Sequence, residues 1–339
     1  MNKMTWATNM RMFAVLGIVF MHCNDYLTEI KAGELVGFLD WGIHVFFKPA
    51  TILFFMISGY LFEAKFGSYS SISFGKFLIK KTKTLLLPYF FIFILFNLVF
   101  NLFIEPNFGE SRHGVNYLQE MNHFFKTIFY SNYWFLLVLF LYIVLNYFIN
   151  SSSIWYWFWA SVLITVFYSF NIYFHFTTHT GHTTAIPGFM TFFLLGRLVF
   201  MGKFNGIRIR IYVLILAFIC ASLESYFLKY DTNTIRFFNA VYSILFFLSL
   251  KEFFGKVSVP NFITSINYYF VYLIHPIVMF HIVSRFFVLH SIRTSCVVVP
   301  SHWFFFILVL VVSIVIEKII FSFSNPISLL FKLGSGHTA

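Results

Sequence analysis

The sequence predicts an all-α, polytopic membrane protein: a bundle of about ten transmembrane helices with both termini in the cytoplasm. Three observations support this fold class. The 339 residues are 60% hydrophobic and only 10% charged, whereas soluble domains average about 25% charged residues. Ten apolar runs are long enough, or nearly so, to cross roughly 30 Å of hydrocarbon. Basic residues concentrate in alternate connecting segments, as they do in cytoplasmic loops.

The predicted spans follow one another closely, so we expect a single domain over residues 1–339 with no fused soluble domain. Asn150–Ser153 separates the fourth span from the fifth and predicts a tight helical hairpin. The sixth span starts at Ile186-Pro187-Gly188, which predicts a tilted or broken helix there. The spans cover residues 10–26, 43–62, 84–104, 132–149, 154–172, 185–201, 211–228, 235–250, 268–286 and 302–323.

Charge decides the predicted orientation. With the N-terminus in the cytoplasm, the inner segments hold fifteen of the 23 lysines and arginines but only three acidic residues. The reversed topology would place nearly all the excess positive charge outside, against the positive-inside rule. The net charge of +11 therefore reflects membrane topology, and we expect the lipid bilayer and not nucleic acid as the partner of these bases.

The first span contains the leading candidate site, because one apolar helix carries two ionisable side chains. Arg11 and His22 are eleven residues apart, which places them roughly 16 Å apart and within about 20° of one helix face. Arg11 would lie at the membrane surface and His22 near the middle of the hydrocarbon, where an ionisable group is costly. A buried imidazole stays neutral and can act as a general base. A helix-end anchor for Arg11 and a packing histidine for His22 are the structural alternatives.

The second span ends in Ser58, Gly59 and Tyr60. The serine offers a hydroxyl and the glycine permits close approach of another helix. Ordinary packing through small residues explains the same pattern.

A basic run follows in the predicted cytoplasmic loop. It could hold the phosphates of a nucleotide-bearing donor, or it could mark topology and contact anionic lipids. It contains no Walker-type phosphate loop. Its lysines are Lys76, Lys80, Lys81 and Lys83.

The ninth span places His275 at a depth comparable with that of His22. Pro276 directly after it should loosen the helical hydrogen-bond ladder and open backbone carbonyls there. A packing histidine is again the structural alternative.

No metal site is predicted. His175, His179 and His182 have spacings that could share a helical face, but no cysteine or carboxylate joins them and Gly181 interrupts the segment. Their role is left open. The three cysteines form no C-x-x-C pair, so they carry no metal or redox signature.

Taken in order along the chain, these motifs resemble the acyltransferase-3 family of integral membrane acyltransferases, which includes bacterial O-antigen and other surface-polysaccharide O-acetyltransferases. The similarity runs from Asn9 to about Met279. Its motifs are Asn9-x-Arg11-x-x-Ala14 with His22, Phe54–Leu61, the basic run into Leu87-Pro88-Tyr89, Tyr133-Trp134-Phe135-Leu136, Phe193–Gly196 and Tyr272–Pro276.

The resemblance implies an acyl-CoA, usually acetyl-CoA, as a co-substrate on the cytoplasmic side of a bacterial inner membrane, with no permanently bound cofactor. The acceptor would be a sugar hydroxyl on a polysaccharide or lipid-linked glycan. By position, His22 would be the catalytic base, and Arg11 would contact the donor or hold the site. Ser58 and the four lysines would assist donor binding. The residues expected to shape a tunnel are Gly59, Tyr60, Trp134 and His275.

The chain departs from the family pattern at two places. Many members have glycine where this chain has Met12, and arginines where it has Lys80, Lys81 and Lys83. Lysine binds phosphate as a point charge without the bidentate fork of arginine.

Two other classes of function fit the same sequence. The protein could be a glycan or lipid exporter that uses its buried histidines as a proton relay. It could also be a non-catalytic membrane assembly subunit, which should tolerate loss of Arg11 and His22. The sequence leaves open acetyl against succinyl or another short acyl group, and it carries no signal for oligomeric state.

Overall fold

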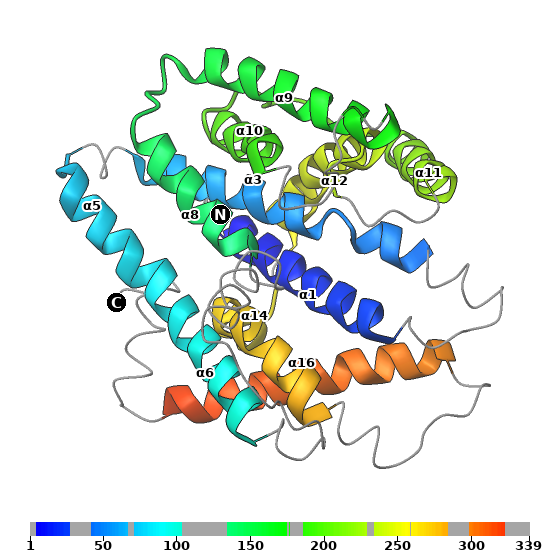
Figure 1. Cartoon of the computed structure of the whole chain (residues 1–339). Helices are drawn as coiled ribbons and strands as arrows, with labels where there is room; N and C mark the ends of the chain where they lie inside the picture. The colour runs from blue at the N-terminus through cyan, green and yellow to red at the C-terminus, as the bar shows by residue number, and fades with distance from the viewer. Residues whose placement is uncertain are drawn as a thin grey trace.

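The computed structural model describes residues 5–27, 42–66, 71–103, 134–174, 176, 186–228, 234–257, 259–283 and 298–322. Within these ranges the regular elements are all helical (Figure 1). The α-helices are α1 (Thr5–Leu27), α3 (Ala50–Ala64), α5 (Phe74–Lys81), α6 (Leu87–Phe103), α8 (Trp134–Tyr147), α9 (Ile154–Phe174), α10 (Met190–Phe200), α11 (Ile211–Phe227), α12 (Phe237–Lys256), α13 (Asn261–Thr264), α14 (Tyr268–Ile277) and α16 (Val298–Ser322).

Helical structure lies within each of the ten predicted spans. Four helices are long and apolar enough to cross a membrane, namely Gly42–Ala64, Ile154–Phe174, Phe237–Lys256 and Trp303–Ser322. The segments Trp134–Tyr147, Ile186–Phe200 and Ile211–Phe227 are shorter apolar helices. The all-helical class is confirmed for the described residues, while ten crossings and cytoplasmic termini remain predictions.

Helices α9, α11 and α16 turn large apolar side chains outward. Leu163 of α9 is 72% exposed and Ile211 of α11 is 69% exposed. So much apolar surface would be unfavourable in water, whereas lipid tails solvate it. These helices therefore suit a bilayer-facing position, and α3 is mostly buried among its neighbours.

Helix α1 runs through the middle of the bundle and packs against α3, α12, α14 and α16 (Figure 1). Helices α3 and α10 make the most extensive contact in the described fold, and two glycines permit it. A Cβ atom on Gly59 would lie 1.9 Å from the Phe193 carbonyl oxygen, and one on Gly196 would lie 1.9 Å from the Met56 carbonyl oxygen. Gly59 thus lies at a helix crossing, which agrees with the packing alternative for this residue.

The connection between α8 and α9 is tight, because the Ser153 amide donates to the Asn150 carbonyl. The two helices then separate, and this differs from the predicted hairpin. Helix α8 packs on α3 and α5, whereas α9 packs on α10 and α12. The sixth predicted span begins with a single 3₁₀ turn over Ile186–Phe189, in line with the irregular start expected from Pro187.

A buried ion pair joins α3, α10 and the turn after α8. The Arg197 side chain is fully buried, and its Nε donates to Glu63 Oε2 at 2.6 Å. Its Nη1 donates to Asn146 Oδ1 at 2.9 Å and to the Ile149 carbonyl at 3.0 Å. The Ser151 hydroxyl donates to the second Glu63 oxygen at 2.8 Å. Arg197, at the inner end of the predicted span 185–201, is one of the fifteen inner bases that predicted the orientation, and in the structure it holds three segments together.

Candidate active site

Helices α1 and α14 bring two histidines together in the centre of the bundle. His22 Nδ1 lies 2.8 Å from His275 Nε2, and the two rings are nearly parallel, with an interplanar angle of 15°. His22 is partly exposed, whereas His275 is fully buried. The sequence predicted similar depths for these residues, and the structure places them in hydrogen-bonding contact.

The second ring nitrogen of His275 is held by its own helix. His275 Nδ1 lies 2.6 Å from the carbonyl oxygen of Tyr272. Pro276 is inside α14, and a π-helical segment, Val278–Val283, follows directly. The predicted disturbance of the helical ladder is therefore present at this histidine.

Aromatic side chains pack around the pair. The Tyr272 ring lies 5.6 Å from the His275 ring, and Phe135 of α8 meets the Tyr272 ring edge-on at 4.8 Å. Trp134 packs against Phe189 at 5.3 Å, and its expected role in shaping the site stays a prediction. Phe135, its neighbour in the same motif, reaches the histidine pair through Tyr272.

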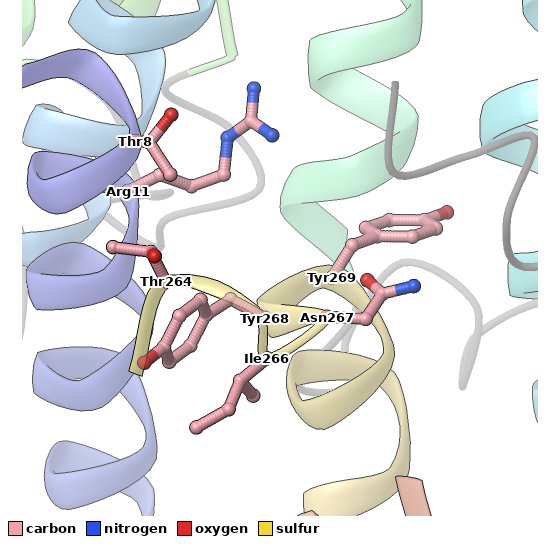
Figure 2. A pocket seen from close by; sticks show the side chains of 7 residues that line it. All are labelled: Thr8, Arg11, Thr264, Ile266, Asn267, Tyr268 and Tyr269. Atoms are coloured by element: carbon pink, nitrogen blue, oxygen red, sulfur yellow. The ribbon is translucent and has the colours of Figure 1, made fainter. Parts of the chain in front are cut away.

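A small pocket lies where α1 begins, next to the turn between α13 and α14. Its volume is about 20 Å³, which is enough for one or a few water-sized groups. Figure 2 shows Thr8 and Arg11 extending from α1, and Asn267 and Tyr269 at the start of α14. The residues lining the pocket are Thr8, Arg11, Thr264, Ile266, Asn267, Tyr268 and Tyr269.

Arg11 and His22 both face α14, as their helical spacing predicted. Arg11 meets the start of α14 through the pocket, and His22 meets His275 about three turns further along α1. The Arg11 guanidinium makes no hydrogen bond or ion pair with the described part of the chain.

The pocket wall is fixed by contacts from distant helices. Glu317 of α16 accepts a hydrogen bond from the Asn267 amide at 3.2 Å. The Tyr269 hydroxyl donates to the Leu85 carbonyl at 2.7 Å. The second Glu317 oxygen lies 3.5 Å from the Lys318 ammonium, so this acid has both a backbone amide and a cation as partners.

Four cations gather around this end of the bundle. Burial lowers the pKa of Lys81 to about 7, and the nearby positive charges of Lys65 and Lys80 contribute to this shift. Burial, Arg11 and Lys80 likewise lower the pKa of Lys65. We call Arg11, Lys65, Lys80 and Lys81 the cationic cluster. Lys65 was not among the predicted donor-binding residues, because it lies outside the basic run.

The other predicted donor-binding residues, Lys76, Lys83 and Ser58, lie outside the cationic cluster and the pocket lining, and their role in donor binding stays a prediction. Lys76 and Lys83 are solvent-exposed, and neither contributes to the pKa shifts within the cationic cluster. Ser58 is partly exposed on α3 and does not line the pocket. Tyr60 packs edge-on against Trp6 at 4.5 Å and against Phe200 at 5.1 Å, which is a packing position.

Among the described residues, no group of three or more histidine, cysteine or acidic side chains could hold a metal ion. His175, His179 and His182 lie outside the described residues, so their role stays open.

Comparison with known proteins gives one match. A family model for an acyltransferase domain, acyltransferase-3, matches residues 4–318. No curated protein and no solved structure matches the chain. The matched range includes both histidines, Arg11 and the whole cationic cluster.

Proposed function

Because this match shows that the chain belongs to the acyltransferase-3 family, we propose that it transfers an acyl group from an acyl-CoA to a sugar hydroxyl. Acetyl-CoA is the simplest donor, and the acceptor is a cell-surface polysaccharide or a lipid-linked glycan. The protein would act in a bacterial inner membrane. The observation that carries the proposal is the hydrogen bond between His22 and His275. His22 lies on the same face of α1 as Arg11, which lines the pocket.

The donor fits the separation of the two parts of the site. The cationic cluster provides charge for the phosphates of CoA, and His22 lies roughly 16 Å further along one continuous helix. An extended phosphopantetheine arm has a comparable length, so the thioester would reach His22 while the phosphates stay at Arg11. Val15 and Ile18, both buried, lie on the α1 face between these points. The arm would have to pass them.

The proposed orientation follows from charge. The end of the bundle that holds the cationic cluster would face the cytoplasm, where acyl-CoA is available. The excess of basic residues in the same connecting segments supports this assignment.

The reaction needs a base that is neutral before the step. The acceptor oxygen attacks the thioester carbonyl carbon while its proton passes to His22, and the carbon–sulfur bond then breaks. The leaving CoA thiolate takes the proton back from His22, which regenerates the neutral imidazole. Atoms and charges balance without a permanently bound cofactor.

The exporter is the second candidate, because two hydrogen-bonded histidines resemble part of a proton relay. Beyond His275, however, the chain of contacts reaches the Tyr272 carbonyl oxygen. A backbone carbonyl accepts a hydrogen bond but does not pass a proton onward. This contact favours a fixed catalytic pair over a relay.

An assay with labelled donor separates the two functions. Membranes containing the protein receive acetyl-CoA labelled in the acetyl group, and label in the glycan fraction is measured against membranes lacking it. We expect protein-dependent label in the glycan. Translocation of glycan without any transferred label would instead support the exporter and contradict the acyltransferase.

Donor binding should depend on pH through Lys81. With a pKa of about 7, Lys81 is mostly charged at pH 6 and mostly neutral at pH 8. Bound phosphate stabilises the charged form, so affinity is full below pH 7 and falls as the pH rises above it. If bound phosphate raises the pKa of Lys81 by about one unit, we expect the KM for acetyl-CoA to increase about fivefold between pH 6 and 8 and to approach a tenfold increase at higher pH.

Lys81→Arg provides the matched control, because arginine stays charged throughout this range. It also corrects for ionisation of the donor phosphates, which is common to both proteins. The KM of Lys81→Arg should vary less with pH than that of the wild type. Parallel pH profiles for the two proteins would exclude Lys81 from donor binding.

A further inference from the structure

We propose that His275 is a positioning residue that fixes the tautomer of His22, so that Nε2 of His22 takes the proton from the acceptor. This inference rests on the proposed acyl transfer and adds a specific atom and a supporting residue to it. One line of hydrogen bonds runs from the backbone of α14 through His275 to His22.

The line starts at Pro276. In a regular α-helix the amide of residue 276 would donate to the carbonyl of Tyr272, four residues earlier. Proline has no N–H, so that donor is missing. The His275 ring occupies the place of the missing donor, with Nδ1 2.6 Å from the Tyr272 oxygen. The His-Pro dipeptide thus creates the acceptor that holds its own histidine.

The carbonyl determines which nitrogen of His275 carries the proton. A carbonyl oxygen is only an acceptor, so His275 Nδ1 must be the donor. The neutral His275 ring then has no proton on Nε2, and Nε2 accepts. Since His275 is fully buried, the neutral ring is the favoured form.

The same reasoning continues to His22. His275 Nε2 is an acceptor 2.8 Å from His22 Nδ1, so His22 must donate from Nδ1. The remaining nitrogen of a neutral His22, Nε2, carries a lone pair and no proton. His22 is the partly exposed member of the pair, and its Nε2 is the nitrogen that His275 leaves available.

The pair also supports the charged intermediate state. When Nε2 of His22 takes the acceptor proton, the ring becomes an imidazolium, and its Nδ1–H bond to His275 becomes a charge-assisted one. That contact is stronger in the reacting state than before it, which is the condition for a contribution to rate. His275 remains neutral and makes no contact with the reacting atoms.

The test combines a spectrum with kinetics on the purified full-length protein in lipid nanodiscs. Nitrogen-15 NMR of histidine-labelled protein reports which ring nitrogens are protonated, and His22→Ala identifies the His22 signals. We expect a protonated Nδ1 and an unprotonated Nε2 on His22 in the wild type. In His275→Ala this preference should be lost, with a fall in kcat of roughly 10- to 100-fold, part of the contribution of a positioned base.

Two further variants separate positioning from folding. His275→Gln offers an amide oxygen in place of Nε2, so it should restore the His22 tautomer and part of kcat. Pro276→Ala returns a competing amide to Tyr272 and removes a helix breaker. It should lower kcat severalfold without lowering the unfolding temperature, a combination that a purely structural role does not produce.

The outcomes are distinct. His275→Ala with unchanged His22 signals, or with the kcat of the wild type, would overturn the positioning role. Absence of acyl transfer by the wild type would refute the proposed function. In that case the spectra still decide whether His275 sets the tautomer, because they do not depend on turnover.

Discussion

His22→Ala is expected to lower kcat for acyl transfer by roughly 10²- to 10⁴-fold, the usual contribution of a positioned general base. Alanine leaves the acceptor hydroxyl with no group to take its proton as it attacks the thioester. Donor binding should persist, since the cationic cluster lies about three helical turns away. The KM for acetyl-CoA should therefore change little.

The measurement is glycan acetylation in cells that contain the variant at the wild-type level, followed by kinetics on the purified protein. Cys23→Ala is a suitable control, because Cys23 is the next residue on α1, is buried, and lies about 100° around the helix from His22. It should retain acetylation. Acetylation retained by His22→Ala would rule out His22 as the base.

The sequence predicted the parts of this site that depend on helical period. Arg11 and His22 lie on one helix, so their spacing was enough to place both on the same face. The pairing of His22 with His275 was not predictable in this way, because 253 residues separate them. Pro276 did predict an opened carbonyl, but only the fold shows that the His275 ring fills the place of the missing donor.

Buried carboxylates illustrate a second limit. Glu224 lies in the predicted span 211–228, and the sequence identifies no partner for it. In the structure it caps α12, accepting hydrogen bonds from the amides of Phe238 and Asn239, both at 2.9 Å. Carboxylates are favoured at helix N-termini. Sequence patterns show side-chain charge but not which backbone amides a fold leaves unpaired, so both Glu224 and Glu317 gained partners only from the structure.

Arg197→Met should destabilise the protein by about 3–5 kcal/mol, the usual cost of breaking a buried ion pair. Methionine fills only part of the space of the arginine side chain and leaves the Glu63 carboxylate buried without its cation, while the hydrogen bond from the Ser151 hydroxyl remains. It also removes both Nη1 hydrogen bonds, to Asn146 and to the Ile149 carbonyl. The unfolding temperature in detergent, followed by tryptophan fluorescence, should fall markedly.

The double variant Glu63→Leu/Arg197→Met decides whether the unpaired charge is the cause. Replacing a whole buried ion pair by apolar groups is often neutral, so the double variant should unfold at a higher temperature than Arg197→Met alone. The exposed pair of Lys256 and Glu252, with a 2.8 Å contact, supplies the control. Lys256→Met should leave the unfolding temperature nearly unchanged, because solvent screens that pair. A double variant less stable than Arg197→Met would instead show that Glu63 stabilises the fold through its other contacts.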